Sequence, residues 1–304
     1  MIGFNLKKAK RHFTEVLEEQ FPQREAEQLM RILLEDLFGI DLKAELMNPS
    51  MRMDELQYAR LEEAVGRLLE GEPVQYVTGK AWFDGLLFHV DDSVLIPRPE
   101  TEGLVQKVAE ELALKAGSEG VSPDKPLRIW DVGTGSGCIA IALAKRFPQA
   151  EVKAFEVSES AMMTACANAE FNEVKIDFIL DDVLHPQSEV WQESVDLVVS
   201  NPPYIRESER SSMERNVLDH EPHSALFVPD DDPLLFYRQI LTLAKPQLPP
   251  GGSIWFEINE ALGEEMIQLC HEMDFEGEIL LDFFGKPRFL HIFAIKNNAK
   301  QSMI

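Results

Sequence analysis

The chain has 304 residues, of which 45% are hydrophobic and 27% are charged. This composition is typical of a globular protein and excludes wholesale disorder. Lys and Arg number 29 against 53 Asp and Glu, which gives a formal net charge of −24. Because phosphate backbones are bound mainly through Lys and Arg, this charge disfavours a nonspecific nucleic-acid surface and fits a basic protein partner better.

Cysteine usage and hydropathy give no sign of export or membrane insertion. The three cysteines, Cys138, Cys166 and Cys270, form no CxxC pair and no Cys/His cluster, so neither a zinc site nor a disulfide framework is predicted. No stretch approaches the ~20 apolar residues that a bilayer span requires. We therefore expect a cytoplasmic protein with no membrane partner.

The first 80 residues predict a small helical domain. Apolar residues recur at helical spacing in three runs, and Asp54 is the expected N-cap of the third run, which ends at Gly71. Residues 81–97 are β-prone and contain an Asp-Gly pair, which predicts a β-hairpin linker between two domains.

Residues 98–296 alternate between strand and helix patterns, which predicts an α/β domain with a mostly parallel, doubly wound sheet of seven strands. The expected strands are 127–132, 151–157, 175–180, 195–200, 253–258, 277–283 and 288–295. The expected helices are 101–116, 137–147, 159–170, 234–246 and 260–273. Since no helix separates the last two strands, they must form a hairpin with one antiparallel strand. Residues 117–126 are expected to form a polar loop, and residues 297–304 a flexible tail.

A glycine-rich loop, Asp131-Val-Gly-Thr-Gly-Ser-Gly137, follows the first strand of this sheet. Ligands of open α/β sheets bind at the carboxyl ends of the strands, and glycines there let a ligand approach the backbone. A turn without a ligand does not need three alternating glycines, so we expect a binding site. The third glycine comes one residue too early for a dinucleotide fingerprint, and no Gly-Lys-Ser/Thr follows, which disfavours NAD and ATP.

Acidic residues follow the next two expected strands. Glu156 can accept hydrogen bonds from a ribose diol, or it can be a charge at the start of a helix capped by Ser158. Asp181, Asp182 and Val183 can lie beside an adenine ring, or can form a solvated turn. Taken with the glycine loop, these residues resemble the pattern of class I S-adenosylmethionine-dependent methyltransferases.

The segment Asn201-Pro202-Pro203-Tyr204 directly follows the expected strand 195–200. Two prolines fix φ and remove two N–H donors, so the chain must leave the sheet and present rigid acceptors. The Asn201 side-chain oxygen and the Pro202 carbonyl suit a planar –NH2 group, and the Tyr204 ring can pack against it. In known methyltransferase families that it resembles, this motif serves the methylation of both adenine N6 and glutamine side-chain amides, so the resemblance implies one of these two substrates.

The whole chain resembles the PrmC/HemK family, the N5-glutamine methyltransferases of peptide chain release factors. The matching segments are residues 73–79 (PVQYVTG), 94–102 (VLIPRPETE), 131–140 (DVGTGSGCIA), 201–205 (NPPYI) and 221–226 (EPHSAL). The resemblance implies a Rossmann-like class I methyltransferase domain preceded by a helical domain that helps to seat the release factor. It also implies methyl transfer from S-adenosyl-L-methionine to the Gln of the Gly-Gly-Gln motif, with S-adenosyl-L-homocysteine as product and no metal.

The resemblance also assigns roles to single residues. The cofactor-binding residues would be Gly133, Thr134, Gly135, Ser136, Gly137, Glu156, Asp182, Val183 and Asn201. The catalytic residues would be Asn201, Pro202 and Tyr204, and the substrate site would add Pro203, Arg98, Thr101 and Glu102, with Pro99 beside them. Arg98 and Glu102 are equally well explained as a structural salt bridge. The chain departs from the family at Glu156, which is usually Asp, and in the loop 227–233.

Two alternatives remain at this point. An adenine-N6 nucleic-acid methyltransferase shares the Asn-Pro-Pro-Tyr chemistry, but the net charge of −24 predicts weak binding to DNA. A noncatalytic cofactor-binding adaptor is disfavoured because Asn201 and Tyr204 are both present.

Overall fold

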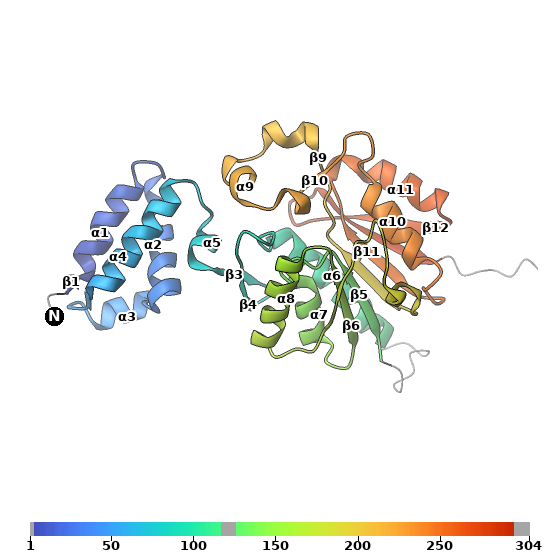
Figure 1. The fold of residues 1–304 in the computed structure, drawn as a ribbon, viewed down its shortest axis with the longest axis horizontal. Coiled ribbons are helices and arrows are strands. Elements are labelled where there is room, and N and C mark those ends of the chain that lie inside the picture. Colours follow the sequence, from blue (N-terminus) through green and yellow to red (C-terminus); the bar gives the residue numbers. More distant parts are fainter. Residues whose placement is uncertain (1–2, 117–125, 295–304) are drawn as a thin grey trace, which may run out of the picture. The chain divides into compact units, whose positions relative to one another are not determined.

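The computed structural model describes residues 3–116 and 126–294 (Figure 1). Nearly all of the loop expected at 117–126, and the whole tail expected at 297–304, lie outside the described residues. The chain forms two compact units. The first contains the residues up to Lys80 together with 90–92 and 213–221, and the second contains the rest of the described chain.

The first unit is helical, and its elements follow from capping and apolar periodicity. Its helices are α1 (Leu6–Leu17), α2 (Gln23–Phe38), α3 (Leu42–Met47), α4 (Glu55–Leu69), α5 (Val74–Thr78) and α9 (Arg215–His220), with the short strands β1 (Phe4–Asn5) and β2 (Arg52–Met53). Asp54 caps α4 as predicted: its side chain accepts from Gln57 N at 2.8 Å, and the Gln57 side chain accepts from Asp54 N at 3.0 Å. The apolar faces of α1, α2, α4 and α5 form one core around Leu17, Met30 and Leu61.

The second unit is built on a seven-stranded sheet, and the predicted Rossmann-like fold is confirmed (Figure 1). The strand order is β12-β13-β11-β8-β5-β6-β7. The strands are β5 (Arg128–Val132), β6 (Glu151–Glu156), β7 (Asp177–Leu180), β8 (Leu197–Ser200), β11 (Ser253–Glu257), β12 (Phe275–Leu281) and β13 (Pro287–Ala294). Only β13 runs antiparallel to its neighbours, β11 and β12, as the hairpin argument requires.

Five helices accompany the sheet: α6 (Pro99–Ala116), α7 (Cys138–Arg146), α8 (Glu159–Phe171), α10 (Leu235–Ala244) and α11 (Gly263–Glu272). A short 3-10 turn, Glu260–Leu262, precedes α11, so the single helix expected over 260–273 is divided. Every residue of β8 and β11 is buried, which is typical of strands covered on both faces. Trp130, Phe155 and Phe256 are among the largest buried side chains of this core.

The predicted hairpin is shorter than expected. It consists of β3 (Lys80–Phe83) and β4 (Leu86–His89), joined by Asp84 and Gly85, whose φ values are 51° and 75°. Two residues with positive φ form the tight turn that suits the twist of a hairpin. The expectation that strand structure continues to residue 96 is wrong. Val94 and Ile96 are apolar because they are buried at 1% and 3% exposure, and not because they pair in a sheet.

One buried polar side chain joins this hairpin to the glycine-rich loop. Asn168, on α8, accepts from His89 N at 2.7 Å and donates to His89 O and Ser136 O, both at 2.9 Å. It is completely buried. Since a buried polar group must be paired, these three bonds set the position of the glycine loop relative to the hairpin.

Replacing Asn168 with Leu should lower the free energy of unfolding by about 3 kcal/mol, because one N–H and two carbonyl groups would lose their partner in the interior. Urea denaturation measures the change. Asn216→Leu, at an exposed position, is the control. Equal stability of the two variants would show that Asn168 does not hold the loop.

Candidate active site

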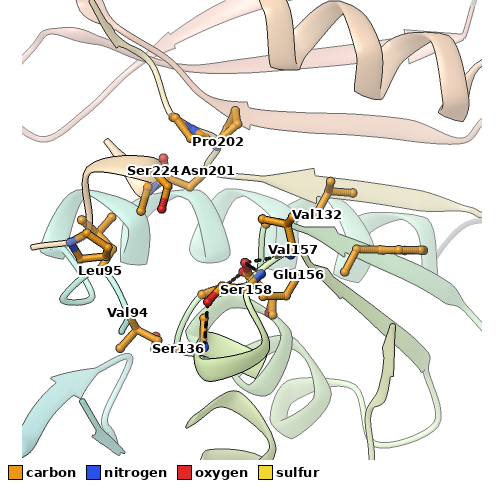
Figure 2. Close-up of a pocket in the computed structure, with 18 of the residues that line it drawn as sticks. Val94, Leu95, Val132, Ser136, Glu156, Val157, Ser158, Asn201, Pro202 and Ser224 are labelled. Atoms are coloured by element: carbon orange, nitrogen blue, oxygen red, sulfur yellow. Dashed lines mark hydrogen bonds between the residues drawn. The ribbon is translucent and has the colours of Figure 1, made fainter. Parts of the chain in front are cut away.

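A cavity of about 320 Å³ opens in the second unit at the carboxyl ends of β5 and β8. The strand order reverses between these two strands, since β6 and β7 lie beyond β5 and β11 lies beyond β8. This is the place where open α/β sheets bind ligands. The lining residues come from within segments 93–101, 132–139, 155–161, 181–184, 201–203 and 222–240. In Figure 2, Asn201 and Ser224 lie on one side of the cavity, and Glu156 and Ser136 on the other.

The glycine loop forms one wall. Gly133, Gly135 and Gly137 have φ values of 74°, 54° and 82°, which explains why glycine occupies these positions. A Cβ built on Gly133 or Gly135 would meet no atom within 4 Å, so both face open space. At Gly137 a Cβ would lie 3.0 Å from Ile141 Cδ1. The first two glycines therefore leave room for a ligand, whereas the third permits close helix packing.

A buried carboxylate, Asp131, fixes this loop from below. Its Oδ2 accepts from Thr134 Oγ1 at 2.7 Å and from Ala140 N at 3.1 Å. Its Oδ1 is buried and has no hydrogen-bond partner in the part of the chain that the structure describes. Complete burial raises the pKa of Asp131 to about 7, although the bonds from Thr134 and Ala140 favour the charged form.

Glu156 lies at the end of β6 and lines the cavity. Its Oε2 accepts from Gly135 N at 2.9 Å, and its Oε1 accepts from Val157 N at 2.9 Å and from Ser158 N at 3.0 Å. The carboxylate is thus tied to the glycine loop and to the start of α8. Two carboxylate oxygens offer about four acceptor positions, so three bonds do not saturate the group.

Asp182 and Val183 also line the cavity, in the turn after β7. Asp182 accepts from Leu184 N at 2.9 Å and contacts His185 Nδ1 at 2.8 Å. Asp181 has a different task, because it holds the turn by accepting from Ser188 N at 2.9 Å and from Trp191 Nε1 at 2.7 Å. The turn is therefore rigid as well as open to the cavity.

The Asn-Pro-Pro-Tyr segment forms the opposite wall. Ser200, the last residue of β8, donates to Val132 O at 2.6 Å, which ties β8 to β5 just before the two chains part. Asn201, Pro202 and Pro203 then line the cavity. Asn201 Nδ2 donates to Thr101 Oγ1 at 3.1 Å. The segment continues into β9 (Ile205–Arg206), which pairs with β10 (Phe227–Val228).

The other predicted residues are divided between the cavity and its support. Arg98 and Thr101 line the cavity, but its described lining residues do not include Pro99, Glu102 or Tyr204. Pro99 begins α6. Glu102 accepts from Asp84 N at 3.0 Å and thereby supports the β3–β4 turn.

The structure also adds a residue that sequence reasoning missed. Glu257, at the end of β11, is 1% exposed. Its Oε2 accepts from Thr101 Oγ1 at 2.7 Å, and its Oε1 accepts from Tyr204 Oη at 2.9 Å. The available signal was an acid that directly follows three apolar residues in the strand Ser253–Glu257. Burial beside Glu257 raises the pKa of Tyr204 well above its usual range, so the phenol remains a donor.

The described residues form neither a metal cluster nor a membrane-spanning helix. Within residues 3–116 and 126–294, no group of three or more His, Cys, Asp or Glu side chains is arranged to hold a metal ion. Over the same ranges, no helix combines the length and apolar composition that crossing a bilayer requires.

The raised pKa of Asp131 predicts a pH dependence of stability. The folded chain keeps the proton up to about pH 7, whereas the unfolded value is 3.8, so this group stabilises the fold most at low pH. Relative to Asp131→Asn, the wild-type free energy of unfolding should fall by up to about 4 kcal/mol as pH rises from 4 to 8. Urea titrations across this range test it, with the exposed Asp231→Asn as control. Parallel profiles for wild type and Asp131→Asn would contradict the assignment.

Comparison with known proteins shows which family shares these features. Residues 8–79 match the family described as PrmC N-terminal domain, and residues 120–222 match the methyltransferase small domain. The chain is 41% identical over 288 residues to the release factor glutamine methyltransferase of Flavobacterium psychrophilum, covering 94% of this chain and 98% of that protein. It is 40% identical over 275 residues to the enzyme of the same name from Bacteroides thetaiotaomicron, covering 90% and 95%.

Solved structures agree on the fold. The hMettl16 catalytic domain in complex with MAT2A 3′UTR hairpin 6 superposes with a TM-score of 0.51 at 13% identity, covering 80% of this chain and 83% of that one. At this identity the likeness concerns the fold alone. The sequence relatives are far more specific, and they extend over both units. On these matches, the chain belongs to the release factor glutamine methyltransferase family.

Proposed function

We propose that this protein transfers a methyl group from S-adenosyl-L-methionine to the side-chain amide nitrogen of the Gln in the Gly-Gly-Gln motif of peptide chain release factors. The observation that carries the proposal is that Asn201, Pro202 and Pro203 line the same cavity as the glycine loop. A site for a planar amide thus adjoins a site that fits a nucleoside-containing cofactor.

The glycine loop fits the cofactor. Gly133 and Gly135 leave open space where side chains would stand, and Glu156 has acceptor capacity left for a ribose diol. Asp182 and Val183 line the cavity, and in this proposal they lie beside the adenine. S-adenosylmethionine, when bound, supplies the methyl group from its sulfonium, so that a C–S bond breaks as an N–C bond forms and one amide proton is released.

The residues opposite the loop hold the nucleophile. Asn201 Nδ2 is already bonded to Thr101, which leaves Asn201 Oδ1 and the Pro202 carbonyl to accept the two N–H groups of a substrate amide. Both acceptors become more favourable as positive charge develops on the nitrogen. No strong base is required at the start, because the nitrogen becomes acidic as it is alkylated. Catalysis then comes from positioning and from fixed dipoles.

The two units suit different tasks. In this proposal the helical domain over residues 1–80 helps to seat the release factor, residues 81–97 link it to the catalytic domain over 98–296, and the reaction takes place in the cytoplasm. The net charge of −24 favours a basic protein surface and disfavours direct binding of nucleic acid.

Methyl transfer from labelled S-adenosylmethionine to three substrates tests the function. The substrates are a release factor, the same factor with the Gly-Gly-Gln glutamine changed to Glu, and duplex DNA. We expect label on the first alone. The Glu variant lacks the amide nitrogen that would be methylated, and the net negative charge of the protein disfavours binding of DNA. Label on DNA would replace this proposal with adenine-N6 methylation. No label on any substrate, with cofactor binding intact, would favour a noncatalytic adaptor.

Asn201→Ala should lower kcat for the release factor by about 10²–10³-fold, since it removes one of two fixed acceptors. Cofactor affinity, measured by calorimetry, should change little, because the glycine loop and Glu156 remain. Asn216→Ala, on the exposed surface of α9, is the matched control. Wild-type turnover by Asn201→Ala would remove Asn201 from the mechanism.

A further inference from the structure

A chain of three side chains leads from a buried carboxylate to the cavity wall. Glu257 accepts the hydroxyl of Thr101 at 2.7 Å, and Thr101 accepts Nδ2 of Asn201 at 3.1 Å. Glu257 and Thr101 are 1% and 2% exposed, so water has little access to the bond between them, whereas Asn201 is half-buried at the cavity. The three residues come from three elements, since Glu257 ends β11, Thr101 lies in α6 and Asn201 follows β8.

The direction of each bond follows from the chemistry of the first group. An ionised carboxylate can only accept hydrogen bonds, so the Thr101 hydroxyl must donate its one proton to Glu257. Toward Asn201 the Thr101 oxygen can then only accept. Asn201 must therefore present its –NH2 group to Thr101, which directs its carbonyl oxygen away from Thr101.

We propose that Glu257 is a positioning residue that sets the orientation of the Asn201 amide through Thr101. With this orientation Asn201 Oδ1 is available to accept an N–H from the substrate amide. With the reverse orientation an –NH2 group would face the –NH2 of the substrate, and the two donors would repel. The inference rests on the proposed function for its kinetic consequence, but the orientation itself is a property of the free protein.

The surroundings of Glu257 make the orientation sensitive to pH. Burial raises the pKa of Glu257, while Thr101, Tyr204 and Arg288 favour its charged form and Glu100 opposes it. Tyr237 on α10 and Cys138 on α7 also face this charge. A protonated Glu257 can donate to Thr101, which would free the Thr101 proton for Asn201 and reverse its amide. The rate should therefore fall as pH falls through the pKa of Glu257.

The direct test observes the Asn201 side-chain amide by NMR in the free enzyme, with its resonance identified by its absence in Asn201→Ala. In wild type we expect Nδ2 protons that are protected from exchange, with a chemical shift that changes as Glu257 takes up its proton. Thr101→Val should abolish the protection and Thr101→Ser should restore it. Glu257→Gln should abolish the titration. Unchanged protection in Thr101→Val, or an unchanged titration in Glu257→Gln, would overturn the proposal.

Kinetics supply the second readout. Thr101→Val should lower kcat about 10–100-fold, the value of one buried hydrogen bond, with little change in KM for the release factor. Thr101→Ser should restore kcat, and Thr242→Val, on the exposed side of α10, should have no effect. Glu257→Gln should lose the acidic limb of the pH–rate profile. Because Glu257 acts through Thr101, the double variant should be no slower than the slower of the two single variants. Losses that multiply would contradict the relay.

The two readouts separate this inference from the proposed function. If wild type shows the protected Asn201 amide but does not methylate a release factor, the orientation holds and the assigned substrate is wrong. If wild type methylates the release factor while Thr101→Val retains both the protection and the rate, the function holds and the relay is wrong. Thermal melting of each variant shows whether it has folded.

Discussion

The separation of the chain after β5 and β8 is the constraint on which the site depends. These strands are neighbours in the sheet, and Ser200 Oγ bonds Val132 O at 2.6 Å at the last point where they are joined. Beyond it, one chain turns into the glycine loop and the other into Asn201-Pro202-Pro203. The chain after β5 leads to β6 on one side of the sheet, and the chain after β8 leads to β11 on the other side. The space between the two chains must therefore be closed by side chains or by a ligand.

Two buried carboxylates fix the walls of this space in the same way. Asp131 holds Thr134 and the start of α7 beneath the glycine loop, and Glu257 holds Thr101 and Tyr204 behind Asn201. Burying a charge is unfavourable, which is why both acids have a raised pKa. When ionised, each of these groups can only accept, and it then fixes the direction in which the hydroxyl groups around it donate. Burial of these acids lowers the stability of the fold, but it fixes which groups at the site donate hydrogen bonds and which accept them.

Local sequence patterns predicted much of the fold and both walls of the site, the glycine loop and the Asn-Pro-Pro-Tyr segment. They did so because periodicity, caps and prolines act over a few residues. The strands and helices of the sheet begin and end close to the expected positions, and Asp54 caps α4. What escaped prediction depends on distant partners. Thr101 and Glu257 are 156 positions apart, and His89 and Asn168 are 79 apart. The apolar stretch Val94–Ile96 misled for a related reason, since burial and strand pairing leave the same signal in a sequence.

The Glu156 side chain connects the glycine loop to the start of α8. Its position at the end of β6 suited either a ribose acceptor or a charge at the start of a helix, and the structure gives it bonds to both the glycine loop and the start of α8. One carboxylate oxygen bonds Gly135 of the glycine loop, and the other bonds Val157 and Ser158 at the start of α8. A diol that bound this carboxylate would add to bonds that already hold Gly135 in place. Binding of the cofactor and rigidity of the loop would then reinforce each other, so the loop would be most ordered when the methyl donor is present.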